Sequence, residues 1–215
     1  MTIFDQIVLL ATGLGAIYMV WFFIQDYKAN GGKYNQYYII SFTVLLVSGL
    51  LLIALGYEVL SNPLVVIVAA IIPIFLSLGL VSEFGSNYEK IYLPFAILGL
   101  LIISITRYIG PEAVGTISLA IIHSIAGLVI LITPILVSKQ GKTSWKFSFV
   151  TLGGFLISVG GISLAFLKIG SPILSADTIF TILAPVLLLM SLSYAYGFIK
   201  KQPPKEIEQN ISKNA

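Results

Sequence analysis

Residues 63–82 read PLVVIVAAIIPIFLSLGLVS, a run of 20 residues without a charged side chain. A helix of about 20 apolar residues is long enough to cross the hydrocarbon core of a bilayer. Comparable apolar stretches recur along the chain, at residues 3–25, 37–57, 63–83, 91–107, 112–138, 146–167 and 174–199. The sequence therefore predicts an all-α integral membrane protein, a bundle of seven transmembrane helices joined by short loops.

The composition supports this class and leaves little material for chemistry. Of 215 residues, 58% are hydrophobic and 10% are charged, and the mean hydropathy is +1.01. Soluble domains have about 45–50% apolar and about 25% charged residues. The chain has no cysteine and one histidine, and it carries no phosphate-binding loop, nucleophile elbow or His-Glu-x-x-His motif. We expect no catalytic residues, no metal site and no enzyme.

The distribution of Lys and Arg predicts the orientation. One side of the predicted bundle would hold Lys28, Lys33, Lys90, Lys139, Lys142, Lys146, Lys200, Lys201, Lys205 and Lys213. Only Arg107 and Lys168 would lie on the other side. By the positive-inside bias, the N-terminus is outside and the C-terminus is cytoplasmic, as in a multi-pass protein of the cell membrane. The transmembrane domain covers residues 1–201, and the polar segment 202–215 is expected to be a disordered cytoplasmic tail.

Small residues predict a contact face on the sixth helix. Gly154, Ser158, Gly161 and Ala165 recur at positions i, i+4, i+7 and i+11, which places them on one side of a helix. In lipid, helices associate where small residues let their backbones approach closely. We interpret these four residues as helix-packing residues.

Aromatic side chains gather near the predicted cytoplasmic boundary. They are Trp21, Tyr27, Tyr34, Tyr37, Tyr38, Tyr88, Tyr92 and Trp145. This distribution is typical of the aromatic belt that anchors helices at the membrane interface.

His123 is the only ionisable residue predicted near the bilayer centre, and such a residue is by default a candidate for a functional site. It could be an axial ligand to haem or chlorin, or a polar anchor for a lipid or quinone. It could also be a neutral imidazole that bonds to a Ser or Thr of the fourth or sixth helix. One histidine without a second His, Cys or Met at the same depth cannot complete a six-coordinate haem within one chain. The identity of any cofactor therefore stays open.

The remaining polar residues predict ordinary interface contacts. Arg107 is expected to form an interfacial ion pair with Glu112 or Asp177, and Glu83 and Glu89 are expected to be solvated beside a short loop. A further group of hydroxyls lies in the last helix and would either line a narrow cavity or bond to its own backbone. These residues are Ser191, Ser193, Tyr194 and Tyr196.

Four segments share features with one known group of seven-helix proteins. They are GLGAIY at 13–18, the stretch 33–57, IPIFL at 72–76, and the stretch 172–183, in which Asp177-Thr178 stands where that group has a Glu-Thr pair. In these segments the chain resembles the microbial rhodopsin family. The resemblance touches most of the chain, and it implies a seven-helix bundle with its N-terminus outside.

The residues that give microbial rhodopsins their function have no counterparts at the matching positions. The retinal-binding lysine of their seventh helix corresponds to about Leu189, and a nearby carboxylate corresponds to Pro185. Their counter-ion and proton-donor carboxylates correspond to Ile67 and Leu78. Without an amine for the Schiff base and without buried carboxylates to move a proton, we expect neither retinal nor light-driven pumping.

These observations favour a retinal-free, non-enzymatic membrane protein that acts as an accessory or binding subunit. Its expected partners are the lipid bilayer and other membrane subunits or further copies of itself, and no nucleic acid is expected. Two alternatives stay open. One is a small-solute or ion transporter with a path near His123, and the other is a haem-carrying subunit of a membrane redox complex that uses His123.

Overall fold

The computed structural model describes residues 1–168 and 170–202, and over these residues the chain is helical without strands. Seven long helices alternate in direction, and all seven are long and apolar enough to cross a membrane. They are α1 (Ile3–Asn30), α2 (Lys33–Leu55), α3 (Pro63–Phe84), α4 (Ser86–Tyr108), α5 (Glu112–Lys139), α6 (Phe149–Lys168) and α7 (Ala176–Ile199). Short 3-10 helices, η1 (Tyr57–Ser61) and η2 (Trp145–Ser148), precede α3 and α6. The predicted all-α bundle of seven transmembrane helices is confirmed. Of the predicted tail, residues 203–215 lie outside the described residues.

Local caps determine where the helices begin and end. Thr2 and Asp5 form a reciprocal capping box at the start of α1, and Gly31 ends this helix with a φ of 71°. A left-handed φ of this kind favours glycine, which has no Cβ to clash. The side chain of Asn62 caps α3 by accepting a hydrogen bond from Leu64, and Pro63 occupies the first turn, where its missing N–H is not needed. α1 extends past the predicted residue 25 because the polar turn before Gly31 remains helical.

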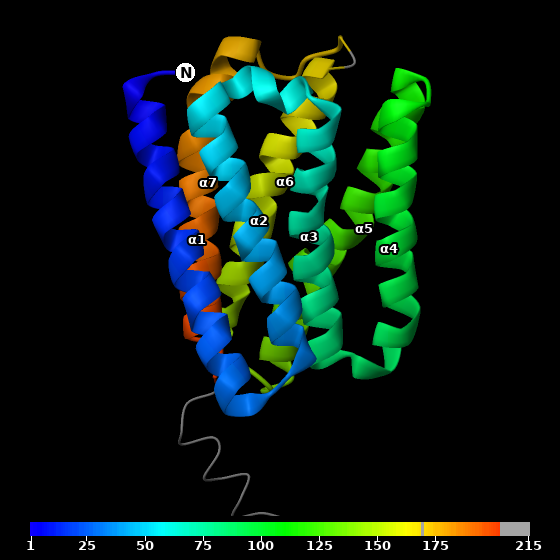
Figure 1. The fold of residues 1–215 in the computed structure, drawn as a ribbon. Coiled ribbons are helices and arrows are strands. Elements are labelled where there is room, and N and C mark those ends of the chain that lie inside the picture. Colours follow the sequence, from blue (N-terminus) through cyan, green and yellow to red (C-terminus); the bar gives the residue numbers. More distant parts are fainter. Residues whose placement is uncertain (169, 203–215) are drawn as a thin grey trace, which may run out of the picture.

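All the long helices except α4 form a closed ring. α4 lies outside this ring, at the edge of the bundle (Figure 1). Around the ring, α1 packs on α2, α2 on α3, α3 on α5, α5 on α6, α6 on α7, and α7 on α1. Because α3 contacts α5 directly, α4 is left at the edge of the bundle, where it packs on both. Gly99 of α4 permits the close contact with α5, since a Cβ at this position would lie 3.1 Å from Ile122 Cγ2.

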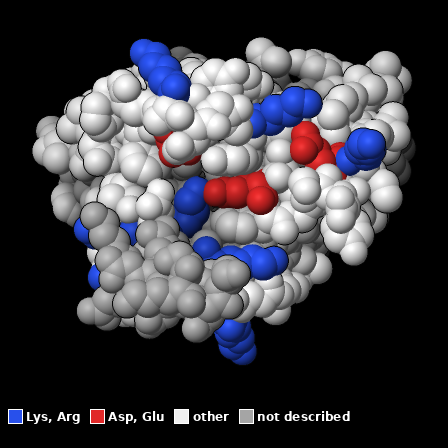
Figure 2. Space-filling model, turned by 90° about the horizontal axis from the view of Figure 1, so that it is seen from below, with Lys and Arg blue, Asp and Glu red and all other residues white. Residues whose placement is uncertain are grey.

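The N-terminus and the end of α7 lie at opposite ends of the bundle (Figure 1), here called the N side and the tail side. Lys side chains are spread over the tail side, with few acidic side chains among them (Figure 2). This distribution agrees with the charge asymmetry of the loops, and the assignment of the tail side to the cytoplasm stays a prediction.

A cysteine-free chain makes this orientation testable. Asn30 and Ser171 are exposed at opposite ends of the bundle. We expect Asn30→Cys to be protected from an impermeant maleimide added to intact cells, and Ser171→Cys to be labelled. Permeabilised cells provide the control, in which both variants should react. Labelling of Asn30→Cys but not of Ser171→Cys in intact cells would reverse the orientation.

An aromatic cluster fills the tail-side half of the bundle. Phe198 of α7 lies 5.1 Å from Phe23, 4.8 Å from Tyr38 and 5.5 Å from Phe147, measured between ring centroids. Trp21 and Trp145 are exposed, at 54% and 67%, as expected of belt residues. Tyr38 was predicted to belong to the same belt, and this is wrong. It has no exposed surface, because its ring is enclosed by α1 and α7.

Candidate functional site

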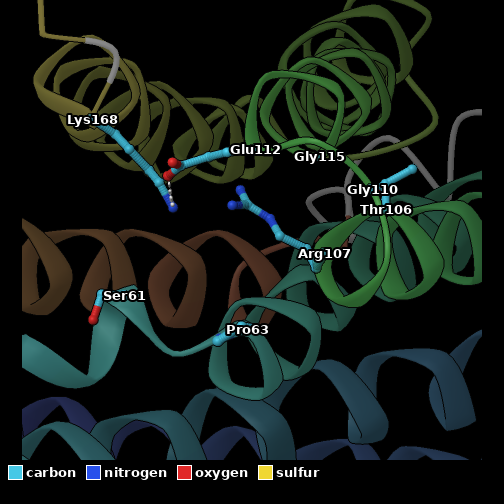
Figure 3. Close-up of a pocket in the computed structure, with 8 residues that line it drawn as sticks. All are labelled: Ser61, Pro63, Thr106, Arg107, Gly110, Glu112, Gly115 and Lys168. Carbon is cyan, nitrogen blue, oxygen red and sulfur yellow. Dashed lines mark ion pairs between the residues drawn. The ribbon is translucent and has the colours of Figure 1, made fainter.

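A polar cavity opens at the N side, and we call it the N-side pocket (Figure 3). It has a volume of about 230 Å³ and lies where the ends of α4 and α6 meet the beginnings of α3 and α5. Its lining residues are Ser61, Pro63, Thr106, Arg107, Gly110, Glu112, Gly115 and Lys168. Sequence reasoning did not predict a cavity here.

The charges of the N-side pocket are unbalanced. Lys168 Nζ lies 3.2 Å from Glu112 Oε1, so Lys168 forms the ion pair that was expected of Arg107. The expected pairing of Arg107 with Glu112 or Asp177 is therefore wrong, because α6 brings a second cation to Glu112. Arg107 Nε is buried and has no hydrogen-bond partner among the described residues. The pocket thus holds two cations and one carboxylate.

Glycines hold the Arg107 end of the pocket in place. Gly115 is buried in the first turns of α5, and a Cβ there would lie 3.0 Å from Thr106 O and 3.5 Å from Arg107 Cδ. A Cβ at Gly110 would lie 2.9 Å from the same carbonyl oxygen. The turn between α4 and α5 can therefore be this tight only with small residues, and its tightness positions Arg107 against the start of α5.

A second group of charges, the tail-side cluster, closes the opposite end of the bundle. Glu83, at the end of α3, forms an ion pair with Lys201, which directly follows α7. Only 11% of the Glu83 side chain and 16% of the Lys201 side chain are exposed. Tyr38 Oη donates a hydrogen bond of 2.9 Å to Glu83, and Lys201 Nζ lies 5.5 Å from the centroid of the Tyr34 ring. Four residues from α2, α3 and the start of the tail are thereby joined.

The expectation that Glu83 is solvated is wrong, and Glu89 is partly buried. Glu83 is buried in the ion pair described above. Glu89 accepts hydrogen bonds from Tyr37 Oη at 3.0 Å and from Ser82 Oγ at 2.9 Å. Both carboxylates accept a hydrogen bond from a tyrosine of α2, Glu83 from Tyr38 and Glu89 from Tyr37. These partners are far away in the sequence, so no local pattern predicts the contacts.

His123 lies in α5 and is partly buried. Its Nδ1 atom is buried and bonds to no Ser or Thr of the fourth or sixth helix within residues 1–168 and 170–202. The backbone of Leu119, one turn earlier in α5, is the polar group next to this imidazole. In the same part of the chain, no three His, Cys, Asp or Glu side chains come close enough together to hold a metal ion. His123 could therefore supply only one nitrogen ligand, to a metal ion or haem whose other ligands come from elsewhere.

The small-residue face of α6 divides into two halves. A Cβ added at Gly154 would lie 2.7 Å from Ile130 Cγ2, and Ser158 Oγ lies 3.9 Å from the Cβ position of Gly127, so this half packs on α5. Gly161 is exposed, and a Cβ there would meet nothing within 4 Å. Ala165, one turn further, is only partly buried. The N-side half of the face is therefore open.

Three of the four hydroxyl residues singled out in α7 pack inside the bundle, and none of the four lines the N-side pocket or the groove between α1 and α2. Ser191, Ser193 and Tyr194 are buried, with at most 8% of their surface exposed, whereas Tyr196 is 39% exposed. Ser191 Oγ lies 3.5 Å from the carbonyl oxygen of Thr12 and donates to it. This contact joins α7 to α1.

Comparison of the chain with protein-family models, with curated proteins and with solved structures finds no match.

Proposed function

We propose that this integral membrane protein is a retinal-free, non-enzymatic accessory or binding subunit of the cell membrane. The observation that carries the proposal is the separation of polar and apolar groups along the bundle. Charged side chains lie toward the two ends of the bundle, and the three clusters of buried side chains between them are hydrophobic. Buried hydroxyls in that core bond to carbonyl oxygens of the helices, as Thr12 does to Val8 and Ser77 to Ile74.

This separation favours binding over transport. A solute path needs polar groups that face a water-filled route through the membrane. The second cavity is instead a groove of about 230 Å³ between α1 and α2, lined by Leu, Ile and Gly residues. It suits acyl chains or a neighbouring helix.

The open half of the α6 face is the surface that best fits a partner helix. Gly161 offers space for close backbone approach, which drives helix association in lipid. The exposed face of α4 carries bulky residues instead, among them Leu98, Leu101 and Ile105. A partner helix would therefore approach more closely at α6 than at α4.

Site-specific crosslinking tests the proposal. We expect a photoreactive maleimide on Gly161→Cys to give one crosslinked product of defined mass, above the 23.3 kDa of the chain, in native membranes. The matched control is Leu101→Cys, which is 51% exposed on α4 and should crosslink mainly to lipid. Equal lipid-only products from both variants, together with a lone monomer after mild solubilisation, would contradict the accessory role.

One observation favours the haem-carrying alternative. The buried Nδ1 atom of His123 has no side-chain partner in the described part of the chain, and buried imidazole nitrogens are normally paired. A haem iron would need its second axial ligand from another subunit. This alternative therefore also requires a partner in the membrane.

A further inference from the structure

The N-side pocket gathers both basic residues that the chain places at that end of the bundle. Arg107 lies in the last turn of α4 and Lys168 ends α6, so they are far apart in sequence. All other Lys residues of the described chain belong to the tail side. The positive-inside bias disfavours basic residues on the translocated side, and two exceptions that line one cavity indicate a shared role.

The existing contacts leave the pocket short of negative charge. Glu112 is paired with Lys168 at 3.2 Å, and the structure places no carboxylate within 4.0 Å of Arg107 in the described residues. The Arg107 side chain reaches across the cavity toward the Lys168–Glu112 pair (Figure 3). Its buried Nε atom lacks an acceptor, and a buried donor without an acceptor is costly. An anion in the cavity would balance the charge of the guanidinium.

The cavity is large enough for a polyatomic anion. Its volume of about 230 Å³ is well above the roughly 30 Å³ that one water molecule occupies in the liquid. The start of α5 adds to the attraction, because no side chain caps its first turn and free N–H groups at a helix N-terminus favour anions.

We propose that the N-side pocket binds a phosphate group through Arg107 and Lys168. A phosphate presents several acceptor oxygens, so it can take paired hydrogen bonds from the planar guanidinium and still lie beside the ammonium. Two sources share this chemistry: the phosphodiester of an anionic lipid in the same leaflet, and free inorganic phosphate. The proposal is independent of the accessory role, since phosphate binding needs no second protein.

The test uses the full chain purified in a mild detergent. Phosphatidylglycerol, phosphatidylcholine and inorganic phosphate are the probes, and native mass spectrometry and the shift of Tm are the readouts. Arg107→Gln and Lys168→Gln remove one charge each from the pocket. Lys142→Gln removes the same charge from an exposed site on the tail side and serves as the control.

We expect binding to the wild type and to Lys142→Gln, and roughly tenfold to 100-fold weaker binding to Arg107→Gln. Lys168→Gln should also weaken binding, and the Tm of each unliganded variant shows whether it is folded. Binding of phosphatidylglycerol but not of inorganic phosphate identifies a lipid headgroup, and the reverse identifies free phosphate. The proposal is overturned if neither probe binds the wild type, or if folded Arg107→Gln and Lys168→Gln bind as tightly as Lys142→Gln.

Discussion

Glu83→Gln is expected to lower the free energy of unfolding by about 1–3 kcal/mol, because it leaves the largely shielded Lys201 ammonium without its counter-charge. The substitution keeps the shape of the side chain and an oxygen that can accept the hydrogen bond from Tyr38. It therefore isolates the charge. Unfolding in mixed micelles with increasing SDS, followed by the fluorescence of Trp21 and Trp145, measures the effect.

The N-side ion pair provides a matched control. Glu112→Gln also removes a carboxylate from a lysine, but the Glu112 side chain is 74% exposed, so the expected cost is about 0–1 kcal/mol. Glu83→Gln combined with Lys201→Met should recover most of the loss, since no unpaired charge is then buried. Equal costs for Glu83→Gln and Glu112→Gln would show that the tail-side cluster does not hold the bundle together.

Gly153→Ala is expected to cost about 1–3 kcal/mol because the added methyl group overfills the contact between α6 and α7. Its Cβ would lie 2.6 Å from Tyr194 Cδ1 and 3.1 Å from the carbonyl oxygen of Met190. Tyr194 is 2% exposed and packs edge-on against Phe42, so its ring has no room to move aside. The helix backbones would have to separate.

Gly161→Ala is the control on the same helix. Both substitutions gain the same helix propensity, up to about 1 kcal/mol, but the Cβ at Gly161 meets nothing within 4 Å. We expect Gly161→Ala to leave the unfolding midpoint unchanged or slightly raised in the monomer. If both variants were destabilised alike under these conditions, α6 would pack differently from the structure.

The sequence predicts the seven spans well because hydropathy is a local property. A stretch such as residues 63–82 must be a helix in lipid, whatever its neighbours are, since its backbone polar groups have no other partners there. The end of α1 at Gly31 and the start of α3 at Asn62 follow from caps that are equally local. His123 and the small residues of α6 could also be singled out, because both are unusual within an apolar helix.

The side-chain contacts could not be predicted in the same way. Lys201 resembles the other lysines of its segment, and no pattern in the sequence distinguishes it as the partner of Glu83. Likewise, the sequence shows that Arg107 and Lys168 are the exceptions to the charge asymmetry, but not that α4 and α6 bring them to one cavity.

The sequence by itself determined the class and the number of helices. Only the tertiary structure decided that α4 lies outside the ring, that Tyr38 is buried and that two cations share the N-side pocket. The physical reason is that lipid is as apolar as the core. A membrane helix can be apolar on its lipid-facing side as well as on its buried side, so hydropathy identifies the helices without showing which face meets which neighbour.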